Sequence, residues 1–295
     1  MSTNLLDADF LRRLEALKRR LTSEARSGES GETSSPRRGT GAEFREHRPY
    51  VPGDDPRRID WMAYARSGEP LIKLFHNEED RIVRLLVDAS ASLGFGTPAK
   101  LDVAQRLAAA LGYMALSSSE RAQVFVARNA ESNPLSAIGG SHRGRRGFGE
   151  LCRELAALRP EGNADLARAI EGTVSRSLRP GVLAVLSDFL DPGNVLNALS
   201  RARAAGHDVL LVQILSEDEL DPKLEGDFAL EDSETGALIE VTADANALGA
   251  YLTRLADLFS SLAIWARKHG ATYIRTTCGS ELEPVVRRAL ARSVD

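Results

Sequence analysis

Three apolar stretches constrain the fold more than any other feature of the sequence. They fall at residues 81–88, 181–188 and 208–215, and each contains an uninterrupted apolar run rather than an alternation of apolar and polar residues. Helical patterns separate them, such as the apolar stripe from Leu101 to Ala115. Strands that are apolar on both faces and alternate with helices form parallel sheets covered on both sides. The sequence therefore predicts an α/β domain with a doubly wound, mostly parallel sheet and helices on both faces.

This domain is expected to span residues 81–295 and to carry one insertion, a β-hairpin around residues 227–242. Two strand-like segments there flank the turn sequence Ser-Glu-Thr-Gly. Asp244 is then expected to cap a long helix whose apolar residues, from Leu248 to Trp265, face the core.

The N-terminal part divides into three segments by composition. Residues 1–21 are predicted to form an amphipathic helix, residues 22–42 a flexible linker rich in Ser, Gly, Glu and Thr, and residues 43–80 a charged and aromatic segment packed on the core. The helix is expected to pack on the body of the same chain, although a docking helix for a partner is the alternative. Its apolar stripe consists of Phe10, Leu14, Leu17 and Leu21.

Composition excludes several classes of protein. The 295 residues include 38 basic and 42 acidic side chains, so the net charge of −4 gives no footprint for nucleic acid. Only Cys152 and Cys278 are present, which excludes a disulfide framework. No N-terminal stretch has the pattern of a signal peptide, and no uncharged apolar run approaches the ~18 residues of a membrane span. A cytoplasmic location is expected.

The first apolar stretch ends in the sequence Leu85-Leu-Val-Asp-Ala-Ser-Ala-Ser92. The carboxylate of Asp88 and the hydroxyls of Ser90 and Ser92 are oxygen donors, which Mg²⁺ or Mn²⁺ prefers. Asp188 ends another apolar strand, and ligands of open α/β sheets bind at the carboxyl ends of the strands. The sequence therefore predicts a metal site formed by Asp88, Ser90, Ser92 and Asp188. In the alternative interpretation, Asp88 and Ser90 only satisfy backbone groups in the turn.

The stretch is similar to the DxSxS motif of the metal-ion-dependent adhesion site in von Willebrand factor A domains. Enzyme classes fit less well. Haloacid-dehalogenase-type phosphatases want a second Asp where Ser90 stands, and the segment Gly94–Lys100 lacks the Gly-Lys-Ser/Thr ending of a P-loop. No Ser lies in a Gly-x-Ser-x-Gly elbow, the five His are scattered, and no His or Cys spacing indicates zinc.

The charged segment offers candidate partner contacts. Its arginines could present bidentate donors to an acidic partner. The balance of signs favours pairing with neighbouring acids instead, with aromatic side chains anchoring the segment to the core. The candidate partner-binding residues are Arg45, Arg48, Arg57 and Arg58.

The same segment carries a family resemblance. The run Glu43-Phe-Arg-Glu-His-Arg-Pro-Tyr-Val-Pro-Gly-Asp-Asp-Pro-Arg-Arg-Ile-Asp-Trp61 resembles the signature of the domain of unknown function 58 family. The resemblance continues through Leu85–Ser92, Leu186-Ser-Asp188 and Asp232-Ser-Glu-Thr-Gly236. It implies a von Willebrand factor A-like core with strand order 3-2-1-4-5-6. It also implies action with a MoxR-type AAA+ ATPase in the assembly or maturation of protein complexes.

One departure bears on the metal site. Adhesion sites supply a Thr from a Gly-Gly-Thr-Asp-Leu-like string, but here the string is Gly162-Asn-Ala-Asp-Leu166, so Ala164 takes the Thr position. Asn163 or Asp165 would have to supply the missing oxygen. Otherwise the metal is bound weakly or the site is vestigial.

The leading hypothesis is a non-enzymatic, metal-dependent protein-interaction module that binds a partner carboxylate. No small-molecule substrate, nucleic acid or membrane span is expected. The alternatives are a metal-dependent phosphohydrolase that uses Asp88 and a metal-free scaffold.

Overall fold

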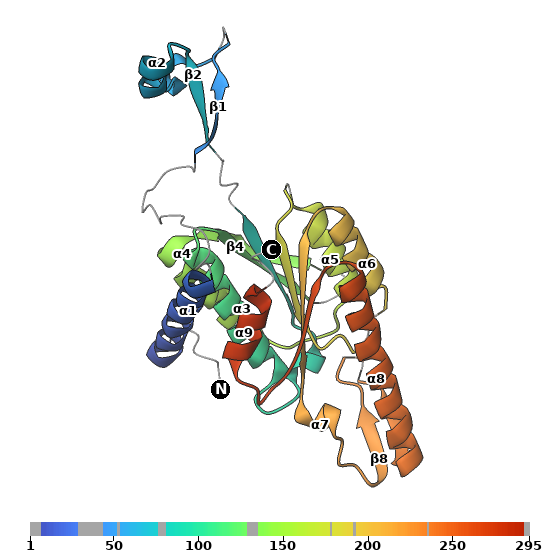
Figure 1. The fold of residues 1–295 in the computed structure, drawn as a ribbon. Helices are drawn as coiled ribbons and strands as arrows, with labels where there is room; N and C mark the ends of the chain where they lie inside the picture. The colour runs from blue at the N-terminus through green and yellow to red at the C-terminus, as the bar shows by residue number, and fades with distance from the viewer. Residues whose placement is uncertain are drawn as a thin grey trace. The chain divides into compact units, whose positions relative to one another are not determined.

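The protein is described from a computed structural model of the 295-residue chain. The structure describes residues 7–28, 44–51, 54–75, 81–128, 135–177, 179–190, 193–234 and 236–291. The chain divides into two compact units, one of residues 1–26 with 82–295 and one of residues 27–81 (Figure 1). Each unit is described by itself.

The larger unit is built on a six-stranded sheet whose order is β10-β7-β6-β3-β4-β5. Read from the other edge, this is the order 3-2-1-4-5-6 that the family resemblance implies, and the prediction is confirmed. All neighbours are parallel except β5, which pairs antiparallel with β4. The strands are β3 (Ile82–Asp88), β4 (Arg121–Ala127), β5 (Leu135–Arg143), β6 (Val182–Ser187), β7 (Asp208–Leu215) and β10 (Thr272–Thr277).

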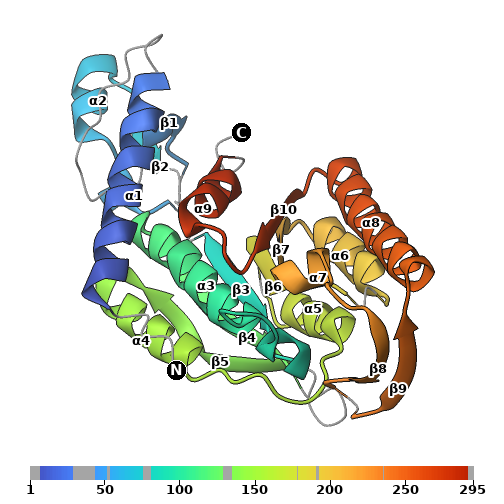
Figure 2. The same cartoon turned by 90° about the horizontal axis from the view of Figure 1, so that it is seen from below.

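Helices cover both faces of this sheet (Figure 2). One face holds α3 (Lys100–Ser117), α4 (Gly144–Ala156) and α9 (Leu282–Leu290), and the other holds α5 (Leu166–Ser175), α6 (Val195–Ala204) and α8 (Ala245–Lys268). Each central strand is buried on both sides, which is why most of its residues are apolar.

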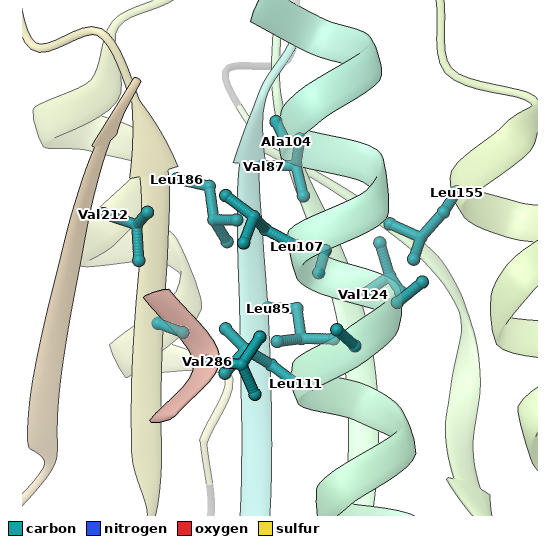
Figure 3. Packing of buried hydrophobic residues seen from close by; sticks show 14 of the residues in the cluster. Leu85, Val87, Ala104, Leu107, Leu111, Val124, Leu155, Leu186, Val212 and Val286 are labelled. Carbon is teal, nitrogen blue, oxygen red and sulfur yellow. The ribbon is translucent and has the colours of Figure 1, made fainter. Parts of the chain in front are cut away.

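Alternate residues of the strands enter two separate hydrophobic clusters. Leu85 and Val87 of β3 point toward α3, where they pack with Leu107 (Figure 3). Leu86, between them, belongs to the opposite cluster with residues of α5, α6 and α8. The uninterrupted apolar runs of the sequence therefore reflect two cores on the two faces of one sheet.

The N-terminal helix α1 (Ala8–Gly28) runs beyond the expected end at residue 21 and takes up part of the expected linker. Glu24, Ala25 and Arg26 favour helix, and the first glycine after them is Gly28. The expected linker residues 29–42 lie outside the described residues. The stripe residues Phe10, Leu14 and Leu17 are buried in the same cluster as α3, so α1 packs on the body of its own chain.

The insertion is a separate two-stranded antiparallel sheet of β8 (Gly226–Glu231) and β9 (Leu238–Ala243), close to the expected range. A short helix, α7 (Glu217–Leu220), precedes it. Asp244 caps α8 as expected, by accepting a hydrogen bond from the backbone N–H of Ala247. The buried residues of α8 begin at Leu255, and Leu252 remains 40% exposed, because the N-terminal part extends past the sheet alongside the hairpin (Figure 1).

The smaller unit contains an antiparallel pair, β1 (Phe44–Pro49) and β2 (Leu71–Phe75), a 3-10 turn at Pro56–Arg58 and the short helix α2 (Trp61–Ser67). Asp60 caps α2 through the backbone N–H groups of Met62 and Ala63, and it also accepts a 2.9 Å hydrogen bond from His47. The charged signature segment therefore forms a small folded unit. Its packing on the larger unit stays a prediction.

Among the described residues, no helix combines the length and the apolar character that crossing a bilayer requires.

Candidate functional site

The two strand-end carboxylates meet at one edge of the sheet. Asp88 is the last residue of β3, and Asp188 directly follows β6, the strand next to β3. Strand order reverses between β3 and β6, which is where open α/β sheets bind ligands. Both residues are 5% exposed. The hydroxyl of Ser187 donates a 2.6 Å hydrogen bond to Oδ2 of Asp88 and so ties the end of β6 to the end of β3.

The serines of the turn after β3 connect these two carboxylates. The backbone N–H of Ser90 donates to Oδ1 of Asp88 at 3.0 Å. The Oγ atoms of Ser90 and Ser92 lie 3.0 Å apart, and Ser92 donates to Oδ2 of Asp188 at 3.1 Å. The four residues predicted from the sequence are therefore joined in one hydrogen-bonded network.

A cation from α3 also enters this network. Nζ of Lys100 lies 2.7 Å from Oδ2 of Asp188 and 2.5 Å from Oε1 of Glu219, and the lysine side chain is 1% exposed. Glu219 is held in turn by the backbone N–H of Ser216, which donates to its Oε2 at 2.7 Å. Burial acts to lower the pKa of Lys100, but the two carboxylates outweigh it and raise that pKa above its ordinary value. The ammonium is therefore charged and shared between two acids.

The charge on Asp88 is not compensated to the same degree. Burial raises the pKa of its carboxyl to about 6, and the nearby charge of Asp188 adds to the increase. Hydrogen bonds from Ser187 and Ser90 act in the opposite direction. A positive charge placed beside Asp88 would favour the ionised carboxylate. The electrostatics of the site therefore favour the binding of a further cation.

Asp188 is fixed by the two strands beyond β6. Its backbone carbonyl accepts a 2.7 Å hydrogen bond from Nε2 of Gln213 on β7. Oε1 of Gln213 accepts in turn from the hydroxyl of Tyr273 on β10, at 2.6 Å. The next residue, Phe189, has a φ of 52°, an unusual conformation for a bulky side chain. This turn directs the carboxylate of Asp188 toward the serines.

The loop before α5 reaches the same edge, because the carbonyl of Gly162 accepts a 2.8 Å hydrogen bond from the backbone N–H of Ala91. The carboxylate of Asp165, however, caps α5 by accepting from the backbone N–H of Arg168 at 2.9 Å. Asn163, Ala164 and Asp165 line one open cleft beside the N-terminus of α6. Neither Asn163 nor Asp165 is hydrogen-bonded into the serine network, so Ala164 leaves its position without an oxygen from this loop.

Glu234 was missed by the reasoning from sequence. It lies in the turn between β8 and β9 and lines the same cleft as Ala164. The hydroxyls of Ser90 and Ser92 lie close enough to its carboxyl group to favour the ionised form. Burial raises its pKa, the two hydroxyls oppose the increase, and the charge of Asp188 adds to it. The only signal in the sequence was the turn string Asp232-Ser-Glu-Thr-Gly236, which gave no direction for the side chain.

Lys100 and Ser187 were also absent from the expected set. Lys100 ends the glycine-rich segment Gly94–Lys100, which lacks the ending of a P-loop, and it is the first residue of α3. Ser187 stands directly before Asp188 in the apolar strand.

The described residues contain no cluster of three or more His, Cys, Asp or Glu side chains arranged to hold a metal ion. An ion at this edge would therefore depend on serine hydroxyls beside Asp88 and Asp188. Oxygen-only donor sets of this kind suit Mg²⁺, which keeps several of its waters.

The partner-binding candidates lie in the smaller unit. Arg48 donates a 2.8 Å hydrogen bond to Oδ1 of Asp54, in line with the interpretation that these arginines pair with neighbouring acids. Arg57 is exposed, and its backbone N–H is bound by Asp55. The side chains of Arg45 and Arg58 lie outside the described part of the structure.

Comparison with known proteins connects this chain to two groups. The uncharacterized proteins Rv1480 of Mycobacterium tuberculosis and Mb1516 of Mycobacterium bovis are each 34% identical to it over 249 residues, which cover 83% of this chain and 74% of theirs. Among solved structures, the conserved hypothetical protein BatB from Bacteroides thetaiotaomicron is similar with a TM-score of 0.46 and 13% identity, over 73% of this chain and 100% of that one. An aerotolerance-related membrane protein from Bacteroides fragilis is similar with a TM-score of 0.44 and 13% identity, over 72% and 97%.

The fold class is shown by the strand topology of the larger unit. The family is shown by a separate match to the sequence. The family model described as protein of unknown function DUF58 matches residues 46–257, a range that includes most of the signature segment, the serine turn and the hairpin. The chain belongs to the DUF58 family.

Proposed function

We propose that the strand-end site holds Mg²⁺ or Mn²⁺ through Asp88, Ser90, Ser92 and Asp188, and that the chain is a protein-interaction module that binds a partner's carboxylate there. One observation carries this proposal. Two buried carboxylates at the switch point of the sheet are linked through Ser90 and Ser92, with the backbone N–H of Ser90 on Asp88 and the hydroxyl of Ser92 on Asp188.

The balance of charge supports a divalent ion. Asp88, Asp188 and Glu219 carry three negative charges in this network, and Lys100 supplies one positive charge. A dication would neutralise the remainder. It would also relieve the repulsion that raises the pKa of Asp88.

Neutral hydroxyl ligands matter for the role of the ion. With few charged ligands, a bound divalent ion remains electrophilic and can accept an oxygen anion from another molecule. The protein's own residues position the donors: Lys100 orients Asp188, and Ser187 orients Asp88. This arrangement suits recognition of an acidic side chain or of a chain's terminal carboxylate.

The partner that the family resemblance implies is a MoxR-type AAA+ ATPase, with a role in the assembly or maturation of protein complexes in the cytoplasm. We propose that this ATPase binds the chain at the strand-end site. Capture of such an ATPase by the immobilised protein in Mg²⁺, and its loss in EDTA, would support it. Equal capture in both buffers would contradict the dependence on metal.

Calorimetric titration with Mg²⁺ and Mn²⁺ tests the metal site directly. The wild-type protein should bind one ion, and Asp88→Asn should abolish binding. Asp208→Asn is the matched control, because Asp208 belongs to the same sheet but lies at the opposite end of β7, where it pairs with Arg203 at 3.0 Å. Wild-type protein that binds no ion, or equal binding by the Asp88→Asn variant, would refute the proposal.

The position of Lys100 favours a second candidate, a metal-free scaffold. Its ammonium already lies 2.7 Å from Asp188 at the edge where a metal would bind. In this case the site would recognise partners without an ion, and EDTA would leave partner binding unchanged.

A further inference from the structure

The hairpin insertion presents Glu234 in a fixed turn. The backbone N–H of Gly236 donates to the carbonyl of Asp232, and the N–H of Asp232 donates to the carbonyl of Ala237, both at 2.8 Å. The backbone N–H of Glu234 itself donates to Oδ1 of Asp232 at 2.8 Å. The Asp232 side chain therefore braces the turn from within, and the conformation of the backbone at Glu234 is defined by three hydrogen bonds.

The turn places Glu234 at the strand-end site. Its carboxyl lies close to the hydroxyls of Ser90 and Ser92, which favour its ionised form and are two of the four residues in the proposed ligand set. It also lines the cleft that contains Ala164, the residue that replaces the expected Thr. A carboxylate of the chain itself thus lies where the proposed function requires a carboxylate from a partner.

Burial of apolar surface does not account for this position. The hairpin leaves Leu230, Leu238 and Ile239 exposed at 44%, 69% and 59%. An isolated two-stranded hairpin is only marginally stable in water. The approach of the hairpin turn to the site is therefore polar, with the Glu234 carboxyl beside Ser90 and Ser92.

The negative charges near this turn also outnumber the positive ones. Glu234 approaches the negative charge of Asp188, and the ammonium of Lys100 is already shared between Asp188 and Glu219. Like charges at short range repel each other, whereas a dication between them would attract both carboxylates. The turn should therefore close firmly on the site only when a cation is bound.

We propose that Glu234 is an intramolecular ligand of the strand-end site, which occupies the position of a partner's carboxylate until the partner displaces the hairpin turn. This inference rests on the proposed function, and it adds how access to the site is regulated. It also defines the partner's task, which is to supply a carboxylate that outcompetes Glu234.

Hydrogen–deuterium exchange of residues 226–243, with and without Mg²⁺, tests the inference. In the wild-type protein Mg²⁺ should slow exchange of the hairpin amides several-fold. Glu234→Gln keeps the shape and removes the charge, so Mg²⁺ should no longer protect the hairpin. Glu231→Gln is the matched control, because Glu231 is an exposed acid in the same hairpin and should respond like the wild type.

Water-proton relaxation of bound Mn²⁺ gives a second readout. Glu234→Gln should increase the number of exchangeable waters on the ion by about one, because the carboxylate no longer occupies a coordination position. Acetate, as a probe for a partner's carboxylate, should then lower the relaxation in Glu234→Gln at concentrations that leave the wild-type signal unchanged.

The outcomes separate this inference from the proposed function. If the wild-type protein binds metal in an Asp88-dependent way but the hairpin exchange ignores both Mg²⁺ and Glu234→Gln, the intramolecular ligand is refuted and the metal site stands. If the wild-type protein binds no metal, the proposed function fails, and the metal-dependent closure of the hairpin fails with it.

Discussion

Replacing Lys100 with Met would remove the only cation in the described strand-end network while keeping a side chain of similar length. The ammonium is 1% exposed and lies 2.7 Å from Oδ2 of Asp188, with Glu219 as its second acceptor. Removing one partner of a buried ion pair leaves an uncompensated buried charge, which typically costs about 3–5 kcal/mol. Since domains are stable by roughly 5–15 kcal/mol, the Lys100→Met variant should lose a large part of its stability.

The proposed metal site adds a second expectation. Without the ammonium, the network keeps its carboxylates and becomes more negative, so Mg²⁺ should bind the variant more tightly than the wild type. Ligand present at about 100 times its dissociation constant stabilises a folded protein by about 2.7 kcal/mol. Mg²⁺ should therefore recover much of the lost stability in the variant, and a smaller amount in the wild type.

Urea unfolding, with and without Mg²⁺, measures both effects through the midpoint at constant slope. Lys268→Met, an exposed change near the end of α8, is the control and should stay within about 0.5 kcal/mol of the wild type. Combining Lys100→Met with Asp188→Asn should cost less than the sum of the two single changes. A cost below about 1 kcal/mol for Lys100→Met would refute the buried ion pair. If Mg²⁺ stabilises neither protein, the ion pair stands but the metal site does not.

Three further predictions concern pH, thiol reactivity and the N-terminal helix. Because the pKa of Asp88 is raised to about 6 from 3.8, the folded protein without metal binds the proton more tightly than the unfolded chain. The contribution of Asp88 to stability is therefore complete below about pH 4 and is lost as the pH rises through 6, and urea midpoints measured across this range in EDTA should show a decline that Asp88→Asn reduces. Burial raises the pKa of Cys152 to about 12 and that of Cys278 to about 11, so neither thiol should react with a disulfide reagent at pH 8 until urea unfolds the protein; rapid labelling of the native protein would contradict this. Leu14→Ala should destabilise the larger unit by about 2–5 kcal/mol, since Leu14 is 3% exposed in the core, whereas a helix reserved for a partner would tolerate the change in a urea titration.

The sheet and the two strand-end acids could be predicted because their signals are local. Burial on both faces of a strand favours an apolar residue at nearly every position, and the runs before Asp88 and Asp188 show this directly. The serine turn follows immediately along the chain, so Ser90 and Ser92 could be placed with it. The cap at Asp244 was equally local.

The rest of the site depends on the placement of distant elements. Lys100 meets Glu219, 119 residues away, only because α7 follows β7 at the same edge of the sheet. The direction of the β8–β9 hairpin is a tertiary property, so Glu234 could not be assigned from its turn sequence. Asp165 had two plausible roles, as a ligand or as a helix cap, and the free N–H groups at the start of α5 take its carboxylate.

The hydroxyl of Tyr251 on α8 donates a 2.7 Å hydrogen bond to the backbone carbonyl of Glu219, whose carboxylate holds Lys100. This bond connects α8, through Glu219, to Lys100 at the edge of the sheet. A displacement of the N-terminal part of α8 would act on Glu219 through this bond, and would change the ion pair between Glu219 and Lys100. The position of α8 is therefore connected to the electrostatics of the strand-end site through Glu219.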